Sequence, residues 1–127
     1  MKFTKDEIRR AMLLYAITDR SWLKEVESLT DVCREVLDNG ATFLQIREKD
    51  LDKENFEKEA AELKKLCEKY RVPFVVNDNV QIALDIDADG VHVGQSDIKG
   101  RDIRSLIGPD KILGISAGTA EEAVAAE

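Results

Sequence analysis

The sequence has little of what several protein classes require: two cysteines, one histidine and no long apolar run in 127 residues. Two cysteines exclude a disulfide-dense mini-protein, and a hydrophobic content of 43% excludes an intrinsically disordered chain. The histidine, His92, has no nearby cysteine with which to form a zinc site, so we expect it to be packed and hydrogen-bonded. Acidic residues outnumber basic ones by 26 to 19, for a formal net charge of −7. That balance argues against nucleic acid and anionic membranes as partners, because both favour a basic surface.

The longest apolar run, residues 11–17, is far shorter than the ~20 residues that a membrane-spanning helix needs. The first seven residues lack the apolar segment of a signal peptide. Both features predict a cytoplasmic protein. Cys33 and Cys67 each fall on an apolar stripe with helical spacing, which predicts two buried thiols that have no catalytic or metal-binding role.

Strand-like and helix-like segments alternate along the chain. A capping box at Thr4 and Glu7 predicts a short leading helix. We expect strands at 12–17, 42–46, 74–76, 89–93 and 112–115, the first of them buried on both faces. We expect helices at 28–39, 53–70 and 80–86, one within 98–106, and a last one from 120. This alternation predicts parallel strands joined by right-handed crossovers.

Two α/β architectures fit a single domain over residues 1–127. One is an open, doubly wound sheet of five strands. The other is the first five units of a (β/α)₈ barrel, the TIM barrel. A complete barrel usually needs about 200–250 residues. The second architecture therefore predicts a partial barrel domain that lacks the C-terminal βα units.

Polar residues collect where ligands bind in both architectures, at the carboxyl ends of the strands. Because side chains alternate along a strand, we expect Gln45, Arg47 and Lys49 on one face. Arg suits bidentate phosphate contact and Lys supplies a compact charge, so this face could hold a polyphosphate. Asp78 and Asp97 follow neighbouring strands, and paired carboxylates beside phosphate ligands indicate magnesium. From the residues alone, a solvated strand end and a helix N-cap at Asp78 stay open as alternatives.

Five motifs in order resemble the thiamine phosphate synthase (thiamine-phosphate pyrophosphorylase) family, from about Leu13 onward. They are Tyr15-Ala-Ile-Thr-Asp19, Gln45-Ile-Arg-Glu-Lys49, Val76-Asn-Asp78, Ala88-Asp-Gly-Val-His-Val-Gly-Gln95 with Asp97, and Ile112-Leu-Gly-Ile-Ser-Ala117. The resemblance implies a (β/α)₈ barrel and a transferase of thiamine biosynthesis. Its reaction joins 4-amino-2-methyl-5-pyrimidinylmethyl diphosphate to thiazole ethyl phosphate, giving thiamine phosphate and diphosphate. Diphosphate leaves first, and the thiazole nitrogen captures the resulting pyrimidine methylene cation.

The resemblance also implies a role for each candidate site residue. The roles are substrate contact to the pyrimidine for Gln45, Asn77 and Ser116, diphosphate binding for Arg47 and Lys49, and Mg²⁺ ligation for Asp78 and Asp97. No acid or base residue is assigned, because the chemistry needs charge neutralisation on the leaving group, supplied by Arg47, Lys49 and magnesium.

The family continues for roughly three more βα units, which carry a Thr-x-(Ser/Thr)-Lys motif and the glycine-rich loops that hold the thiazole phosphate. We therefore expect the 127-residue chain alone to lack turnover and to self-associate through open sheet edges. Two alternatives stay open. A thiazole tautomerase-like relative is disfavoured, because such proteins often alter the position of Gln45 and carry a histidine near Gly118. A receiver-like module is disfavoured, because Asp19 stands alone and Ser116 replaces the expected lysine.

Overall fold

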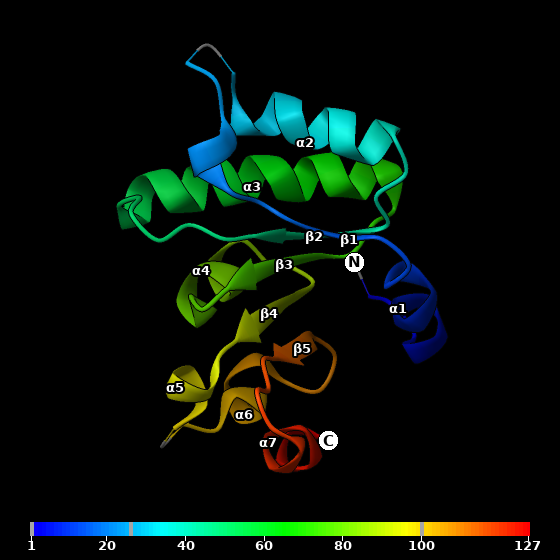
Figure 1. The fold of residues 1–127 in the computed structure, drawn as a ribbon, viewed down its shortest axis with the longest axis vertical. Coiled ribbons are helices and arrows are strands. Elements are labelled where there is room, and N and C mark those ends of the chain that lie inside the picture. The colour runs from blue at the N-terminus through cyan, green and yellow to red at the C-terminus, as the bar shows by residue number, and fades with distance from the viewer. Residues whose placement is uncertain (1, 26, 100) are drawn as a thin grey trace.

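The computed structural model describes residues 2–25, 27–99 and 101–127, without the side chain of Trp22. Within these residues five strands form one parallel sheet: β1 (Tyr15–Ile17), β2 (Phe43–Ile46), β3 (Phe74–Asn77), β4 (Gly90–Val93) and β5 (Ile112–Ile115). The helices are α1 (Lys5–Ala11), the 3₁₀ turn η1 (Arg20–Trp22), α2 (Leu29–Asp38), α3 (Lys53–Tyr70), α4 (Val80–Asp85), α5 (Gln95–Ile98), α6 (Ile103–Ile107) and α7 (Ala120–Ala126). Figure 1 shows α2 and α3 packed side by side over β1 and β2.

The order of the strands separates the two predicted architectures. Each strand pairs in parallel with its neighbour in the sequence, from β1 through to β5. A doubly wound sheet reverses its direction of strand addition at a switch point, and this sheet has no such reversal within the described residues. The doubly wound prediction, and with it the receiver-like alternative, does not match the structure.

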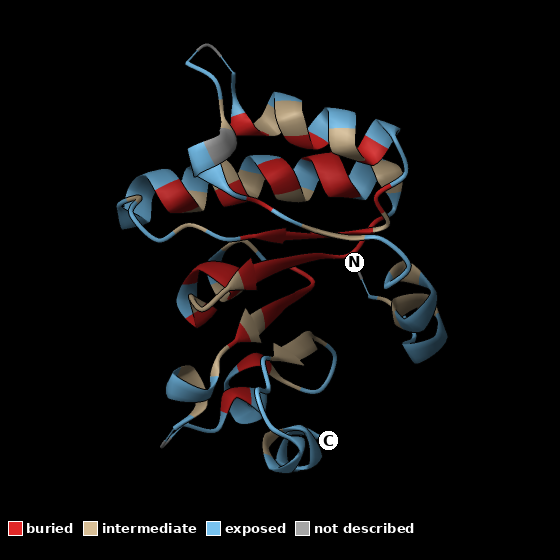
Figure 2. Cartoon of the chain, viewed as in Figure 1, coloured by how far each residue is buried: buried red, intermediate tan, exposed pale blue. Residues whose placement is uncertain are grey.

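The main core lies between the helices and one face of the sheet (Figure 2). Leu44, Ile46, Phe74 and Val76 alternate along β2 and β3 and are buried in this core. The helices present their apolar stripes to it, as Leu63 of α3 does. The other face of the sheet carries Gln45 of β2 and Asn77 of β3, two of the predicted ligand-binding residues.

Local signals predict most element ends correctly. Ser28 caps α2 by accepting from Asp31 N at 3.0 Å, and Gly40 adopts a φ of 108° just beyond the helix. The capping box of Thr4 and Glu7 is present at α1. The bounds predicted for α3 and β5 are those observed.

Two predicted elements differ. The run 12–17 predicts a strand buried on both faces, but β1 is three residues long and Leu13 is 85% exposed. The reason is position: β1 is the edge of the sheet, and no residue of the preceding helix α1 is buried. The single helix expected within 98–106 is replaced by α5 and α6, and Gly100 between them lies outside the described residues.

Both cysteines are free and buried, as their helical spacing predicts. Burial raises the pKa of the Cys33 thiol to about 11, and it raises the pKa of Cys67 as well. These thiols are core residues. Across the described part of the chain, no helix combines the length and the apolar content needed to span a membrane.

Candidate functional site

A chain of hydrogen bonds runs from Tyr15, the first residue of β1, to the carboxyl ends of β2 and β3. The Gln45 side chain, 2% exposed, donates from Nε2 to Tyr15 Oη at 2.8 Å. Its Oε1 accepts from Asn77 Nδ2 at 2.9 Å, and Asn77 Oδ1 accepts from Lys49 Nζ at 3.2 Å. Each amide therefore has its oxygen and nitrogen assigned by its neighbours. Tyr15 is held in turn by stacking on Phe43, with ring centroids 4.2 Å apart.

Charged groups cluster at the outer end of that chain. Lys49 Nζ also donates to Asp78 Oδ2, so the ammonium joins the amide network to a carboxylate. Burial raises the pKa of Asp78, but its hydrogen bonds, that from Lys49 foremost, and the charges of Lys49 and Arg47 together outweigh this effect. The pKa of Asp78 consequently lies below its ordinary value of 3.8. The predicted cations and carboxylates therefore act on one another in the folded chain.

Asp78 is placed by its backbone rather than by capping a helix. Its φ of 62° lies in the left-handed region, and its N–H donates to His92 O at 2.8 Å. The N-cap of α4 is Asn79, whose side chain accepts from Ile82 N at 3.0 Å. The alternative that Asp78 is a helix N-cap is thus wrong, and its carboxylate is turned toward Lys49.

Asp97 reaches the same edge from α5. Its Oδ2 accepts from Gly94 N at 2.8 Å, which fixes the side chain across the end of β4. Two carboxylates beside the predicted phosphate ligands Arg47 and Lys49 suit Mg²⁺, which commonly takes one or two protein carboxylates and completes its shell with substrate phosphate oxygens and water. No cluster of three or more His, Cys, Asp or Glu side chains suited to a metal occurs among the described residues. The donor set therefore suits an ion shared with a phosphate ligand.

Ser116 follows β5 and is joined to β4. His92 Nε2 lies 2.8 Å from Ser116 Oγ, and Gln95 Nε2 donates to Ser116 O at 2.8 Å. Burial lowers the pKa of His92 despite the charge of Asp78. The expectation of a packed, hydrogen-bonded histidine is confirmed, but its contact with a site residue is new. The alternation of side chains along β4 could have predicted this contact, because His92 pairs with Asn77 and lies on the same face of the sheet.

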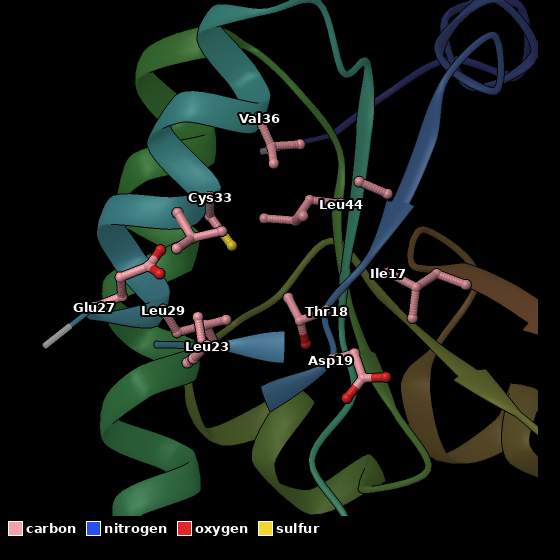
Figure 3. Close-up of a pocket in the computed structure, with 11 residues that line it drawn as sticks. Ile17, Thr18, Asp19, Leu23, Glu27, Leu29, Cys33, Val36 and Leu44 are labelled. Atoms are coloured by element: carbon pink, nitrogen blue, oxygen red, sulfur yellow. The ribbon is translucent and has the colours of Figure 1, made fainter. Parts of the chain in front are cut away.

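The hollows on the surface differ in the side chains that line them. A hollow of about 440 Å³ with a mixed polar and apolar lining includes Lys49, Asn77 and Asp78. A neighbouring hollow of about 320 Å³ includes Arg47, Glu48 and Lys49. A third cavity, of about 230 Å³, lies between α2 and the helix-facing side of β1 and β2 (Figure 3). Its lining is mostly apolar, and none of the predicted site residues contributes to it.

Sequential parallel βα units with polar groups at the strand ends define an α/β protein with a candidate ligand site at the carboxyl edge of the sheet. The sequence profile of the family described as "Thiamine monophosphate synthase" matches residues 14–127. The chain therefore belongs to that family.

Individual relatives agree with this assignment. The chain is 43% identical over 123 residues to a thiamine-phosphate synthase of Clostridioides difficile, covering 97% of this chain and 58% of that protein. It is 47% identical over 122 residues to a thiamine biosynthetic bifunctional enzyme of Saccharomyces cerevisiae, covering 96% of this chain and 22% of that one. It superposes on a thiamine phosphate pyrophosphorylase from Pyrococcus furiosus with a TM-score of 0.83 at 34% identity, covering 94% of this chain and 56% of that one. The chain thus spans little more than half the length of the Clostridioides and Pyrococcus proteins and less than a quarter of the yeast enzyme.

Proposed function

We propose that this chain supplies the pyrimidine diphosphate site of a thiamine phosphate synthase. One observation carries the proposal: Lys49 Nζ contacts both Asn77 Oδ1 and Asp78 Oδ2. The ammonium therefore stands between amides that suit a heteroaromatic ring and charged groups that suit a diphosphate. Membership of the family supports the same assignment, and the relatives described above are named as synthases, which favours this reaction over a tautomerase.

The chain's own residues would bind and orient the first substrate. Gln45 and Asn77 hold amides in fixed orientations and present them to the pyrimidine, with Ser116 as a further hydrogen-bonding group. Arg47 and Lys49 bind the diphosphate. As the bond between the methylene carbon and the diphosphate oxygen breaks, the electron pair leaves on the diphosphate, and these cations stabilise the growing charge.

Asp78 and Asp97 would hold Mg²⁺ together with the diphosphate. When bound, the ion supplies Lewis-acid stabilisation of the phosphate oxygens. The pKa of Asp78, held below its ordinary value, keeps that carboxylate ionised and able to act as a ligand at neutral pH. No side chain needs to act as acid or base, because the cation that remains is captured directly by the thiazole nitrogen.

The sheet is proposed to be the first five strands of a (β/α)₈ barrel. Sequential strand order and helices packed on one face support this, as does the match to 56% of the Pyrococcus structure. On this proposal, further βα units supply the thiazole phosphate site, and the 127-residue chain by itself turns over no substrate. A cytoplasmic location stays a prediction of the sequence.

Calorimetry with the pyrimidine diphosphate tests the site. The 127-residue chain is expected to bind it with Mg²⁺ and to lose most of that affinity in Asp78→Asn and in Asp97→Asn. Asp31→Asn is the matched control, because Asp31 pairs with Arg34 on the exposed side of α2. Magnesium-dependent binding that is unchanged in both site variants would contradict the assignment of Asp78 and Asp97 as metal ligands. Assays of the chain, and of any longer polypeptide that carries it, with both substrates test the reaction itself.

We also propose that the chain self-associates through the edges of its sheet. Within the described residues β1 and β5 each have a strand neighbour on one side only. The β1 edge is flanked by exposed Leu13, Leu14 and Ile17, and such an edge pairs readily with another chain. Light scattering is expected to give a mass above 14.3 kDa, and Leu13→Lys is expected to lower it. A monodisperse monomer would contradict this proposal.

A further inference from the structure

Glu48 lies between the two proposed diphosphate ligands in the sequence and lines the same hollow as they do. Its side chain is 3% exposed, whereas Arg47 and Lys49 are exposed. An unpaired carboxylate at this hollow would repel a diphosphate and neutralise the cations beside it. The buried acid must therefore have another partner.

That partner is Arg20, in the 3₁₀ turn η1 that follows β1. Its Nε lies 3.1 and 3.2 Å from the two oxygens of Glu48, and its Nη2 donates to Glu59 of α3. One guanidinium thus joins the segment after β1, the segment after β2 and the long helix. A planar guanidinium can hold two carboxylates in fixed directions, which a lysine ammonium cannot do.

The backbone beside Glu48 is held as well. The Thr18 hydroxyl accepts from Arg47 N at 2.9 Å, and Thr18 N donates to Gln45 O at 3.0 Å. Glu48 is the sequence neighbour of both cations, so holding Glu48 and the backbone beside it restricts where Arg47 and Lys49 can point. Arg47 and Lys49 line the hollow of about 320 Å³ after β1 and β2, together with Arg20 and Glu48 themselves.

We propose that Arg20 and Glu48 are positioning residues that act through the backbone to direct Arg47 and Lys49 at the diphosphate. This inference rests on the proposed function. Neither residue needs to touch the substrate: Glu48 anchors the segment, and Arg20 orients Glu48 against the body of the protein. Glu48 within the Gln45–Lys49 motif therefore holds the segment that carries Arg47 and Lys49.

Calorimetry with inorganic diphosphate and Mg²⁺ tests the inference on the 127-residue chain. Arg20→Met and the isosteric Glu48→Gln are each expected to weaken binding about tenfold, the size typical of residues that orient a ligating group. The double variant is expected to lose no more than either single one, because both act through one contact. Arg20→Lys should fail to restore affinity, and Arg34→Met, which removes an exposed pair on α2, should bind normally.

Each other outcome overturns the inference in a different way. Additive losses would make Arg20 a direct ligand of the diphosphate. Lower unfolding midpoints with unchanged dissociation constants would leave the contact a purely structural one. If Arg47→Ala abolishes binding while the Arg20 and Glu48 variants bind normally, the inference fails and the proposed function stands. If the unmodified chain does not bind diphosphate, or binds it without Arg47, both fail.

Discussion

Asn77 on β3 donates a hydrogen bond from Nδ2 to Gln45 Oε1 on β2, at 2.9 Å, and the contact sets the direction of both amides. Gln45 must then offer its NH₂ to Tyr15, and Asn77 must offer its oxygen to Lys49. Polar groups from three strands are thereby preorganised in one direction. Preorganised groups cost little to arrange when a ligand binds or charge develops.

Replacing Gln45 by leucine should destabilise the chain. The substitution leaves Tyr15 Oη and Asn77 Nδ2 without this partner at a buried position, which costs about 1–3 kcal/mol in the free energy of unfolding. Tyr15→Phe is the matched control: it removes one hydrogen bond, keeps the stacking on Phe43, and should cost about 1 kcal/mol. Urea denaturation measures both. Equal stability of Gln45→Leu and the unmodified chain would show that the amide chain is not formed.

Removing the Lys49 ammonium should raise the pKa of Asp78. In the unmodified chain burial raises this pKa, but the hydrogen bond and charge of Lys49, together with the other groups around Asp78, hold it below 3.8. In Lys49→Met burial acts with less opposition, so the carboxyl titrates at higher pH. Carbon-13 NMR of the side-chain carboxyl follows the titration. Lys111→Met, which removes the partner of Asp87, is the control that should leave Asp78 unchanged.

An alanine at position 114 should disturb the contact between His92 and Ser116. A Cβ built at Gly114 would overlap Nδ1 of His92, on the neighbouring strand. Overpacking of this kind typically costs about 1–3 kcal/mol, so thermal unfolding should shift downward. Gly118→Ala is the comparison, since its Cβ would lie 3.8 Å from Glu122 Oε1, in ordinary van der Waals contact. Similar midpoints for the two variants would contradict the packing of His92.

The Cys33 thiol should stay unreactive in the folded chain at pH 8.5. Burial raises its pKa from 9.0 to about 11, so much less thiolate forms than in an unfolded chain. Between these two pKa values the folded chain keeps the thiol proton and the unfolded chain loses it, so the shift stabilises the folded state. This contribution is full below pH 9 and is lost as the pH rises through about 11. Alkylation with iodoacetamide, followed by mass spectrometry with and without urea, measures the difference, and rapid labelling of the folded chain would refute it.

The fold could be read largely from local signals. Apolar spacing and N-caps placed α2 and α3 to within a residue or so, because these helices carry their own start and stop signals. The extent of β1 could not be read in this way. A continuous apolar run looks the same whether a second neighbour covers it or not, and only the sheet order identifies β1 as an edge.

The candidate site was predictable in part for a similar reason. The carboxyl ends of parallel strands meet at one edge, so Lys49, Asn77 and Asp78 could be expected together. The contacts of Arg20 with Glu48 and of His92 with Ser116 could not, because they depend on where turns and registers place side chains that are distant in sequence. Alternation within β4 could have indicated His92, since it shares a face with Asn77.

Asp78 and Asp97 are proposed to share a divalent ion with a diphosphate held by Arg47 and Lys49. Manganese in place of magnesium tests it, because the paramagnetic ion broadens NMR signals of carboxyl groups close to it. With diphosphate present, we expect selective broadening of the Asp78 and Asp97 side-chain carboxyl signals, with the Asp31 signal unaffected. The proposal would be contradicted if the Asp78 and Asp97 signals stayed sharp, or if their broadening were the same without diphosphate.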